Sequence, residues 1–303
     1  MGKKTKVALS VGAAGIAAWA ASKVVAKPVP REGKKALDFE NPIILAHRGG
    51  LADTPEHTMA AFTASAELGV HGFAIDARLT KDEEIILFHD ETVDRTTDLS
   101  GNVSDFTLQE LKAADAGYGF SDDNGIFKYR DQGEQVVTLR EMLELFPHMF
   151  VMINLVDAPD TYEGSLMPSK LWGLLDEIGV EDRIAVTSPY DEQTDRFNLY
   201  AQHKIAIGAG VNEVKKAYAA YASRFGHLYN PRADLFRVPD KKALFHYGSD
   251  SFVQFLSRLN IPIYFEAITD RGTFTRLLNA GAAGFIVDNP ELALEIVQEH
   301  GGE

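Results

Sequence analysis

The sequence predicts an α/β fold, a closed (β/α)8 TIM barrel preceded by an N-terminal hydrophobic segment. About eight short apolar runs alternate with helical patterns, which is typical of a parallel sheet with crossover helices. Polar and reactive side chains follow directly after several of these runs, and barrels build their sites at such strand ends. No Gly-x-Gly-x-x-Gly motif follows a run, so a dinucleotide-binding open sheet is not indicated.

The expected elements follow one another in order along the chain. Apolar runs bounded by turn residues predict strands at 43–47, 72–77, 85–89, 150–155, 184–187, 205–207, 261–265 and 285–287. Apolar residues at helical spacing predict helices at 58–68, 108–114, 139–145, 171–178, 211–222 and 274–278. Residues 115–137 are expected as a long surface loop, since their Asp-rich stretch lacks the spacing of an EF-hand.

Composition narrows the functional classes. The 303 residues are 45% hydrophobic and 24% charged, which is typical of a soluble globular protein. The absence of cysteine excludes disulfides, thiolate metal sites and thiol nucleophiles. Lys and Arg number 30 against 44 Asp and Glu, a net charge of −14, which argues against nucleic acid as a partner because phosphate contacts need clustered basic residues.

The N-terminus has the pattern of a targeting segment. An uncharged run at 7–22 follows three lysines, Lys3, Lys4 and Lys6. Residues 1–26 are therefore expected to be either a cleaved signal peptide or a membrane anchor, and the run alone leaves both open.

The remainder divides into a linker and one domain. Residues 27–41, with two prolines and a glycine, are expected to be a linker, and residues 42–303 the barrel domain. The basic residues before the apolar run place that domain outside the cytoplasm, either anchored to the cell membrane and facing outward or secreted.

Two histidines are the candidate catalytic residues. His47 and His89 each close an expected strand, and strand ends of a barrel meet at one mouth. Paired imidazoles suit general acid–base chemistry near neutral pH. Arg48 follows His47 directly, and a guanidinium group there suits an anionic phosphate. A single histidine could be purely structural, but two at neighbouring strand ends favour a site.

Two carboxylates complete the candidate site. Asp76 lies within an apolar strand, where an ionised side chain needs a partner such as a metal ion or an arginine. Glu56 follows Pro55 at the start of an expected helix. Glu56 could instead have a structural role, because the helix dipole favours a carboxylate at the start of a helix.

These residues fall in motifs that resemble one known family. The motifs are His47-Arg48-Gly49, Pro55-Glu56-His57-Thr58, Ala61-Phe62, Thr80-Lys81-Asp82, His89-Asp90, Asp94-Arg95-Thr96-Thr97 and Gly284-Phe285-Ile286-Val287-Asp288-Asn289-Pro290. Together they resemble the glycerophosphodiester phosphodiesterases over about residues 43–298, most specifically in the N-terminal half.

The resemblance implies a hydrolase of lipid metabolism that cleaves glycerophosphodiesters to glycerol 3-phosphate and an alcohol. The expected substrate is a small-molecule or lipid-derived phosphodiester. His47 and His89 match the family's acid–base pair, and Arg48 matches a phosphate contact. The resemblance also implies a divalent cation, Ca²⁺ or Mg²⁺, for which Glu56 and Asp76 are the remaining candidate ligands.

The chain departs from the family where that cation would bind. Ala74 stands where the family carries a metal-ligating glutamate, and Asn154 or Val156 stands where it carries a second one. Glu266 stands where the family has a tryptophan. A hard cation prefers several anionic oxygen ligands, so these changes weaken the expected metal site.

Three functions remain open at this point. The first is an active phosphodiesterase with an altered metal site. The second is a pseudoenzyme barrel that binds a phosphate-bearing ligand, because Ala74 and Asn154 or Val156 replace the expected metal carboxylates. The third is a metal-independent phosphodiesterase that uses a basic residue in place of the metal, as in the related bacterial phosphatidylinositol-specific phospholipases C. The third has the least support, since the replaced positions carry no positive charge.

Overall fold

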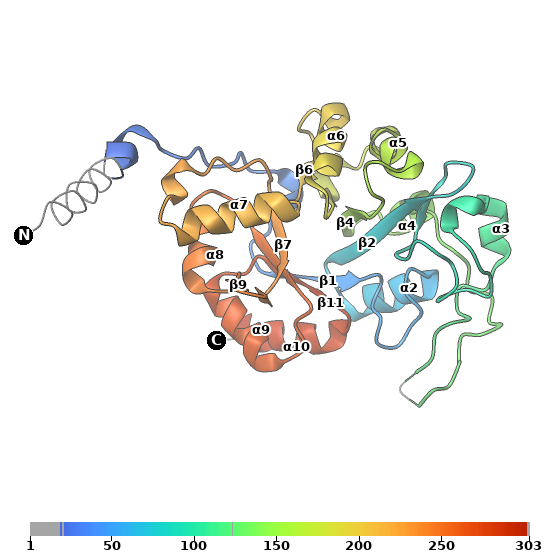
Figure 1. Cartoon of the computed structure of the whole chain (residues 1–303). Helices are drawn as coiled ribbons and strands as arrows, with labels where there is room; N and C mark the ends of the chain where they lie inside the picture. Colours follow the sequence, from blue (N-terminus) through green and yellow to red (C-terminus); the bar gives the residue numbers. More distant parts are fainter. Residues whose placement is uncertain (1–18, 20, 123, 302–303) are drawn as a thin grey trace, which may run out of the picture.

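An eight-stranded parallel sheet curls into a TIM-barrel-like core (Figure 1). The structure, a computed structural model, describes residues 19, 21–122 and 124–301. The strands are β1 (Ile43–His47), β2 (Gly72–Leu79), β4 (Phe150–Leu155), β5 (Ile184–Thr187), β6 (Ala206–Ile207), β7 (Phe236–Pro239), β10 (Ile263–Glu266) and β11 (Gly284–Val287). Their spatial order is β6-β5-β4-β2-β1-β11-β10-β7, and one parallel bridge from Gly208 to Leu235 joins the two ends of the sheet. The predicted α/β class with a parallel, barrel-like sheet is thus confirmed.

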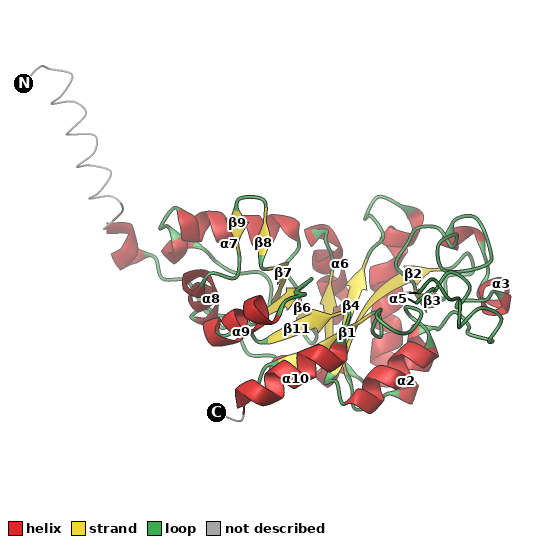
Figure 2. Cartoon of the chain, turned by 90° about the horizontal axis from the view of Figure 1, so that it is seen from below, coloured by secondary structure: helices red, strands yellow, loops and turns green. Residues whose placement is uncertain are grey.

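Helices surround this sheet, as the view in Figure 2 shows. They are α2 (Met59–Leu68), α3 (Leu108–Ala113), α4 (Leu139–Leu145), α5 (Tyr162–Ile178), α6 (Asp191–Ala201), α7 (Val211–Ala222), α8 (Asp250–Ser257), α9 (Arg271–Ala280) and α10 (Pro290–Gly301). Short 3-10 turns cover Lys35–Leu37, Val103–Asp105, Glu181–Arg183 and Gly226–Leu228. A threonine side chain caps the start of each of α2, α3, α4 and α5, accepting a hydrogen bond from the backbone N–H three residues on.

One predicted strand needs correction, and one strand of the sheet was not predicted. The run expected at 85–89 forms β3 (Ile85–Leu87), which pairs antiparallel with the far end of β2 and is not a strand of the curled sheet. The eighth strand of the curled sheet is instead β7, which pairs with β10. It was not predicted because Arg237 interrupts its apolar run. A small hairpin of β8 (Lys241–Lys242) and β9 (Phe245–His246) follows it.

The inside of the curled sheet changes from apolar to polar along its strands. Its buried apolar side chains include Leu45, Ala74, Met152, Leu235 and Tyr264. Two residues further along the same strands, and so on the same face, are His47, Asp76, Asn154, Arg237 and Glu266. A second, larger apolar cluster lies between the sheet and the helices. The interior of the sheet therefore has an apolar layer and, next to it at the carboxyl ends of the strands, a polar layer.

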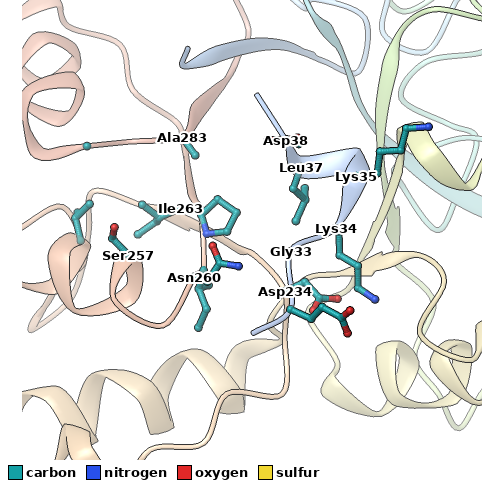
Figure 3. A pocket seen from close by; sticks show the side chains of 15 residues that line it. Gly33, Lys34, Lys35, Leu37, Asp38, Asp234, Ser257, Asn260, Ile263 and Ala283 are labelled. Carbon is teal, nitrogen blue, oxygen red and sulfur yellow. The ribbon is translucent and has the colours of Figure 1, made fainter. Parts of the chain in front are cut away.

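From Arg31 onward, the segment predicted as a linker packs against the end of the sheet that lies opposite the polar layer. Arg31 Nε donates to Asp234 Oδ1 over 2.9 Å, and Ala36 is buried. The ring of Phe39 meets that of Phe150 edge-on, with centroids 5.5 Å apart. This segment and the amino ends of β10 and β11 line a cavity of about 630 Å³ (Figure 3).

The predicted signal peptide or anchor lies mostly outside the described residues. Of its residues 1–26, the structure describes 19 and 21–26. In the described part of the chain, no helix is long and apolar enough to cross a membrane.

Candidate active site

The mouth of the curled sheet gathers the predicted site residues. His47 is the last residue of β1, Asp76 lies in β2, and His89 follows β3 by two residues. After His47 the chain turns sharply, because Gly49 has a φ of 89°. A Cβ atom at Gly49 would lie 2.8 Å from that of Ala61, so only glycine lets α2 approach this closely.

His47 is oriented by a carboxylate. Its Nδ1 lies 2.7 Å from Oδ1 of Asp288, the residue that follows β11. This hydrogen bond lowers the pKa of the Asp288 carboxyl. Since an ionised carboxylate can only accept, Nδ1 carries the proton and Nε2 keeps its lone pair for a substrate or water.

His89 is oriented in the same way. Its Nδ1 lies 2.7 Å from Asp90 Oδ1, while Asp90 Oδ2 accepts from Arg95 Nε over 2.5 Å. Burial opposes ionisation of Asp90, but the hydrogen bonds from Arg95 and His89 lower its pKa to about 2. Arg78 Nε and Nη2 donate to the His89 carbonyl over 3.0 and 2.9 Å, which fixes the loop that carries the imidazole.

Glu56 connects the two histidine segments. Its carboxylate accepts from Arg48 Nη1 over 3.1 Å and from Arg95 Nη1 and Nη2 over 2.9 and 2.7 Å. Burial raises the pKa of Glu56, but the Arg95 hydrogen bond and the Arg48 charge bring it below its ordinary value. The chain of contacts from Arg48 through Glu56 and Arg95 to Asp90 therefore holds both ends of the site in one network.

Asp76 is buried beneath this network. Its Oδ1 accepts from Asn154 Nδ2 over 2.8 Å, and its Oδ2 lies 3.1 Å from Arg48 Nε. Burial raises the pKa of the Asp76 carboxyl, but the charges of Arg237 and Arg48 lower it below its ordinary value. The prediction that Asp76 needs a charged partner is met by Arg48.

His57 supports Asp76 from the backbone side. Its Nε2 accepts a hydrogen bond from the Asp76 backbone N–H over 3.1 Å. Nε2 therefore carries no proton, and the imidazole is neutral. Burial lowers the pKa of His57 to about 4. The residue has a φ of 56°, in the left-handed region that asparagine tolerates well.

Arg237 is the main site residue that the sequence did not reveal. It points into the mouth from β7, and its Nε donates to Glu266 Oε2 over 2.7 Å. Burial lowers the pKa of Arg237, but the charges of Glu266 and Asp76 outweigh this and raise the pKa above its ordinary value. The one available signal is the alternation Phe-Arg-Val after Leu235, which is too short to separate a strand from a loop.

The carboxylates of the mouth do not fit a divalent cation. Among the described residues, no three His, Asp or Glu side chains are grouped as metal ligands. Both oxygens of Glu56 and of Asp76 face guanidinium or amide nitrogens. Arg48, expected as a phosphate contact, lies between these two carboxylates with 14% of its side chain exposed.

A cavity of about 420 Å³ opens beside the polar layer. Asn154, Arg237 and Glu266 line its inner end. Most of the other lining side chains are apolar, among them Val211, Val214, Val238, Phe245 and Tyr247. Thr187, Ser188, Lys215 and Lys242 line it as well. The cavity therefore offers both a charged floor and an apolar wall.

Comparison with known proteins points to one family. Residues 47–292 match the model of the glycerophosphoryl diester phosphodiesterase family. A glycerophosphodiester phosphodiesterase of Caldanaerobacter subterraneus subsp. tengcongensis is 28% identical over 265 residues, covering 86% of this chain and 99% of that protein.

Solved structures share the fold. The glycerophosphoryl diester phosphodiesterase domain of a Mycobacterium tuberculosis protein superposes with a TM-score of 0.72 at 20% identity, over 84% of this chain and 99% of that one. An Oleispira antarctica phosphodiesterase, solved in complex with its product sn-glycerol-3-phosphate, superposes with a TM-score of 0.69 at 22% identity, over 85% and 97%.

Proposed function

This chain belongs to the glycerophosphoryl diester phosphodiesterase family, and we propose that it hydrolyses glycerophosphodiesters to glycerol 3-phosphate and an alcohol. The observation that carries the proposal is the pair of histidines at one mouth, each held by a carboxylate through Nδ1. Both thereby keep Nε2 for proton transfer. This arrangement favours hydrolysis over the binding-only alternative, which requires no such orientation of either imidazole.

The reaction consumes one water and needs two proton transfers. One imidazole takes a proton from the attacking water as its oxygen bonds to phosphorus. The other gives a proton to the alcohol oxygen as the phosphorus–oxygen ester bond breaks. His47 and His89 supply these two roles, and the carboxylates of Asp288 and Asp90 stabilise whichever imidazole is charged.

We further propose that the substrate is lipid-derived and carries an alkyl or acyl chain. The apolar wall of the 420 Å³ cavity, which includes Phe245 and Val214, is suited to such a chain, and the charged floor at Arg237 is suited to the phosphate. An acylated glycerophosphodiester should then have a lower KM than its deacylated counterpart. Phe245→Asp should raise only the former KM. Equal KM values for the two substrates in the wild-type protein contradict this assignment.

Phosphorus NMR of the products tests the hydrolase proposal. Glycerophosphocholine is incubated with the protein in three parallel samples, with Ca²⁺, with Mg²⁺ and with EDTA. The expected result in at least one sample is the growing signal of sn-glycerol 3-phosphate. Release of phosphocholine would mean that the ester bond to glycerol is cleaved instead of the bond to choline, which contradicts the proposal. An unchanged spectrum in all three samples contradicts it too.

The location is likewise a proposal. The three lysines before the apolar run at 7–22 support a protein that is anchored to the cell membrane and faces outward, or is secreted. Cell fractionation with an antibody against the barrel domain distinguishes these. Intact chain in the cytoplasmic fraction alone contradicts both.

A further inference from the structure

We propose that the guanidinium group of Arg237 supplies to the substrate phosphate the positive charge that a divalent cation would otherwise supply. The inference rests on the proposed function, since it concerns the phosphate of that reaction. It replaces the expected Ca²⁺ or Mg²⁺ with a side chain of this chain.

The first argument is the charge balance of the mouth. Five of its carboxylates are each paired with an arginine already. Arg48 lies against Glu56 and Asp76, and Arg95 holds Glu56 and Asp90. The other pairs are Arg78 with Asp157 and Arg237 with Glu266. A divalent cation bound here would have to displace a guanidinium group from its carboxylate.

The second argument is the chemistry of the replaced positions. Ala74 is buried among the apolar residues inside the sheet and offers no oxygen ligand. Asn154 directs its amide nitrogen, not its oxygen, toward Asp76. Its amide oxygen instead lies 3.4 Å from Thr187 Oγ1. These two side chains thus leave Asp76 as a single carboxylate in contact with an arginine.

The third argument is the placement of Arg237. Only 14% of its side chain is exposed, and it lines the floor of the 420 Å³ cavity beside Asn154. Within the described residues its side-chain hydrogen bond is made by Nε alone, to Glu266. Nη1 and Nη2 therefore remain as donors for an anion that enters the cavity. A guanidinium group stays charged at any working pH and matches two phosphate oxygens at once.

The use of a guanidinium group in place of a cation has a chemical consequence. A guanidinium group carries one positive charge and holds no bound water, so it stabilises charge on the phosphoryl oxygens without acidifying the nucleophile. Activation of water then falls entirely on the imidazoles of His47 and His89. The proposal thus predicts a site whose turnover and ligand binding do not depend on added metal.

The test measures binding and turnover in the same metal-free preparation. Calorimetry with sn-glycerol 3-phosphate in EDTA is run on the wild type, Arg237→Gln, Arg237→Lys and the surface control Arg271→Gln, which replaces an α9 arginine paired with Glu295. Hydrolysis of glycerophosphocholine by the wild type is followed with EDTA and with Ca²⁺ or Mg²⁺. Because Arg237→Gln leaves Glu266 unpaired, Arg237→Gln/Glu266→Gln serves if the single variant does not fold.

The expected result is binding in EDTA that Arg237→Gln weakens about 10–100-fold, that Arg237→Lys weakens less, and that Arg271→Gln leaves unchanged. Wild-type turnover should be equal with EDTA and with cation. Binding or turnover that requires Ca²⁺ or Mg²⁺ overturns the inference and leaves the hydrolase proposal intact. If no sample hydrolyses the diester, the hydrolase proposal fails, and metal-free binding lost in Arg237→Gln still supports the role of Arg237. Undiminished binding by Arg237→Gln overturns that role.

Discussion

The two histidines of the mouth are held in the same way, with Nδ1 against a carboxylate, which leaves Nε2 for proton transfer. His47 uses Asp288 and His89 uses Asp90, each at 2.7 Å. Sequence motifs were sufficient to name both histidines as candidates. They did not identify the role of Asp288, because its contact with His47 joins residues 241 positions apart and exists only once β1 and β11 are paired.

Asp288 is therefore a positioning residue whose loss should lower turnover more than substrate binding. Asp288→Asn keeps the size of the side chain but removes the charge that stabilises the imidazolium of His47. We expect kcat to fall on the order of 10–100-fold with KM nearly unchanged, and Asp288→Glu to recover part of it. The surface variant Asp182→Asn is the control. A rise in KM at constant kcat would instead make Asp288 part of substrate binding.

His57 predicts a pH dependence of stability. The histidine has an ordinary pKa of 6.5 in the unfolded chain and about 4 in the folded protein, where burial disfavours its charge. Between these values the unfolded chain binds more protons, so the stabilisation is complete above pH 6.5 and is lost as the pH falls toward 4. Of the free energy of unfolding, about 2 kcal/mol should be lost from this group between pH 7 and pH 5.

Urea unfolding at pH 7 and pH 5 measures this loss. His57→Asn suits the positive φ and removes the titratable group, so this variant should lose less stability on acidification than the wild type. His148→Asn, at an exposed position, is the matched control and should behave as the wild type does. Equal losses in the wild type and His57→Asn would assign the acid sensitivity to other groups.

Among the elements, most apolar runs were predictable, and the short interrupted run of β7 was not. β1, β4, β5, α4 and α7 match the expected ranges residue for residue. β7 was missed because Arg237 stands in its centre, and with the strand its site residue was missed too. The antiparallel direction of β3 also could not be predicted, because strand direction depends on which neighbour the strand pairs with rather than on its own residues.

The segment before β1 should contribute to stability through one buried ion pair. Asp234 has 3% of its side chain exposed and is paired with Arg31, so Arg31→Met leaves an uncompensated buried carboxylate. We expect the free energy of unfolding to fall by about 3 kcal/mol in a urea titration.

Lys35 provides a matched control on the same segment. Its ion pair with Asp182 is solvent-exposed, with 75% and 67% of the two side chains accessible, so Lys35→Met should cost less than about 1 kcal/mol. Equal small losses for the two variants would indicate that the segment before β1 does not stabilise the barrel.

At the scale of the whole molecule, net charge and local charge differ. The chain carries −14, yet Arg48, Arg78, Arg95 and Arg237 converge on the mouth. Composition gives the net charge but says nothing of this cluster, because folding brings basic side chains from β2, β7, the turn after β1 and a later loop to one place. An acidic protein can therefore hold a site for a phosphodiester.

The central claim is that His47 and His89 act as one acid–base pair. It is tested most directly by kcat/KM for glycerophosphocholine in the wild type, His47→Gln, His89→Gln and the double variant. We predict that each single variant falls about 10²–10⁴-fold, and that the double variant is little worse, because both residues serve one proton-transfer scheme. Turnover that survives both substitutions would contradict the account.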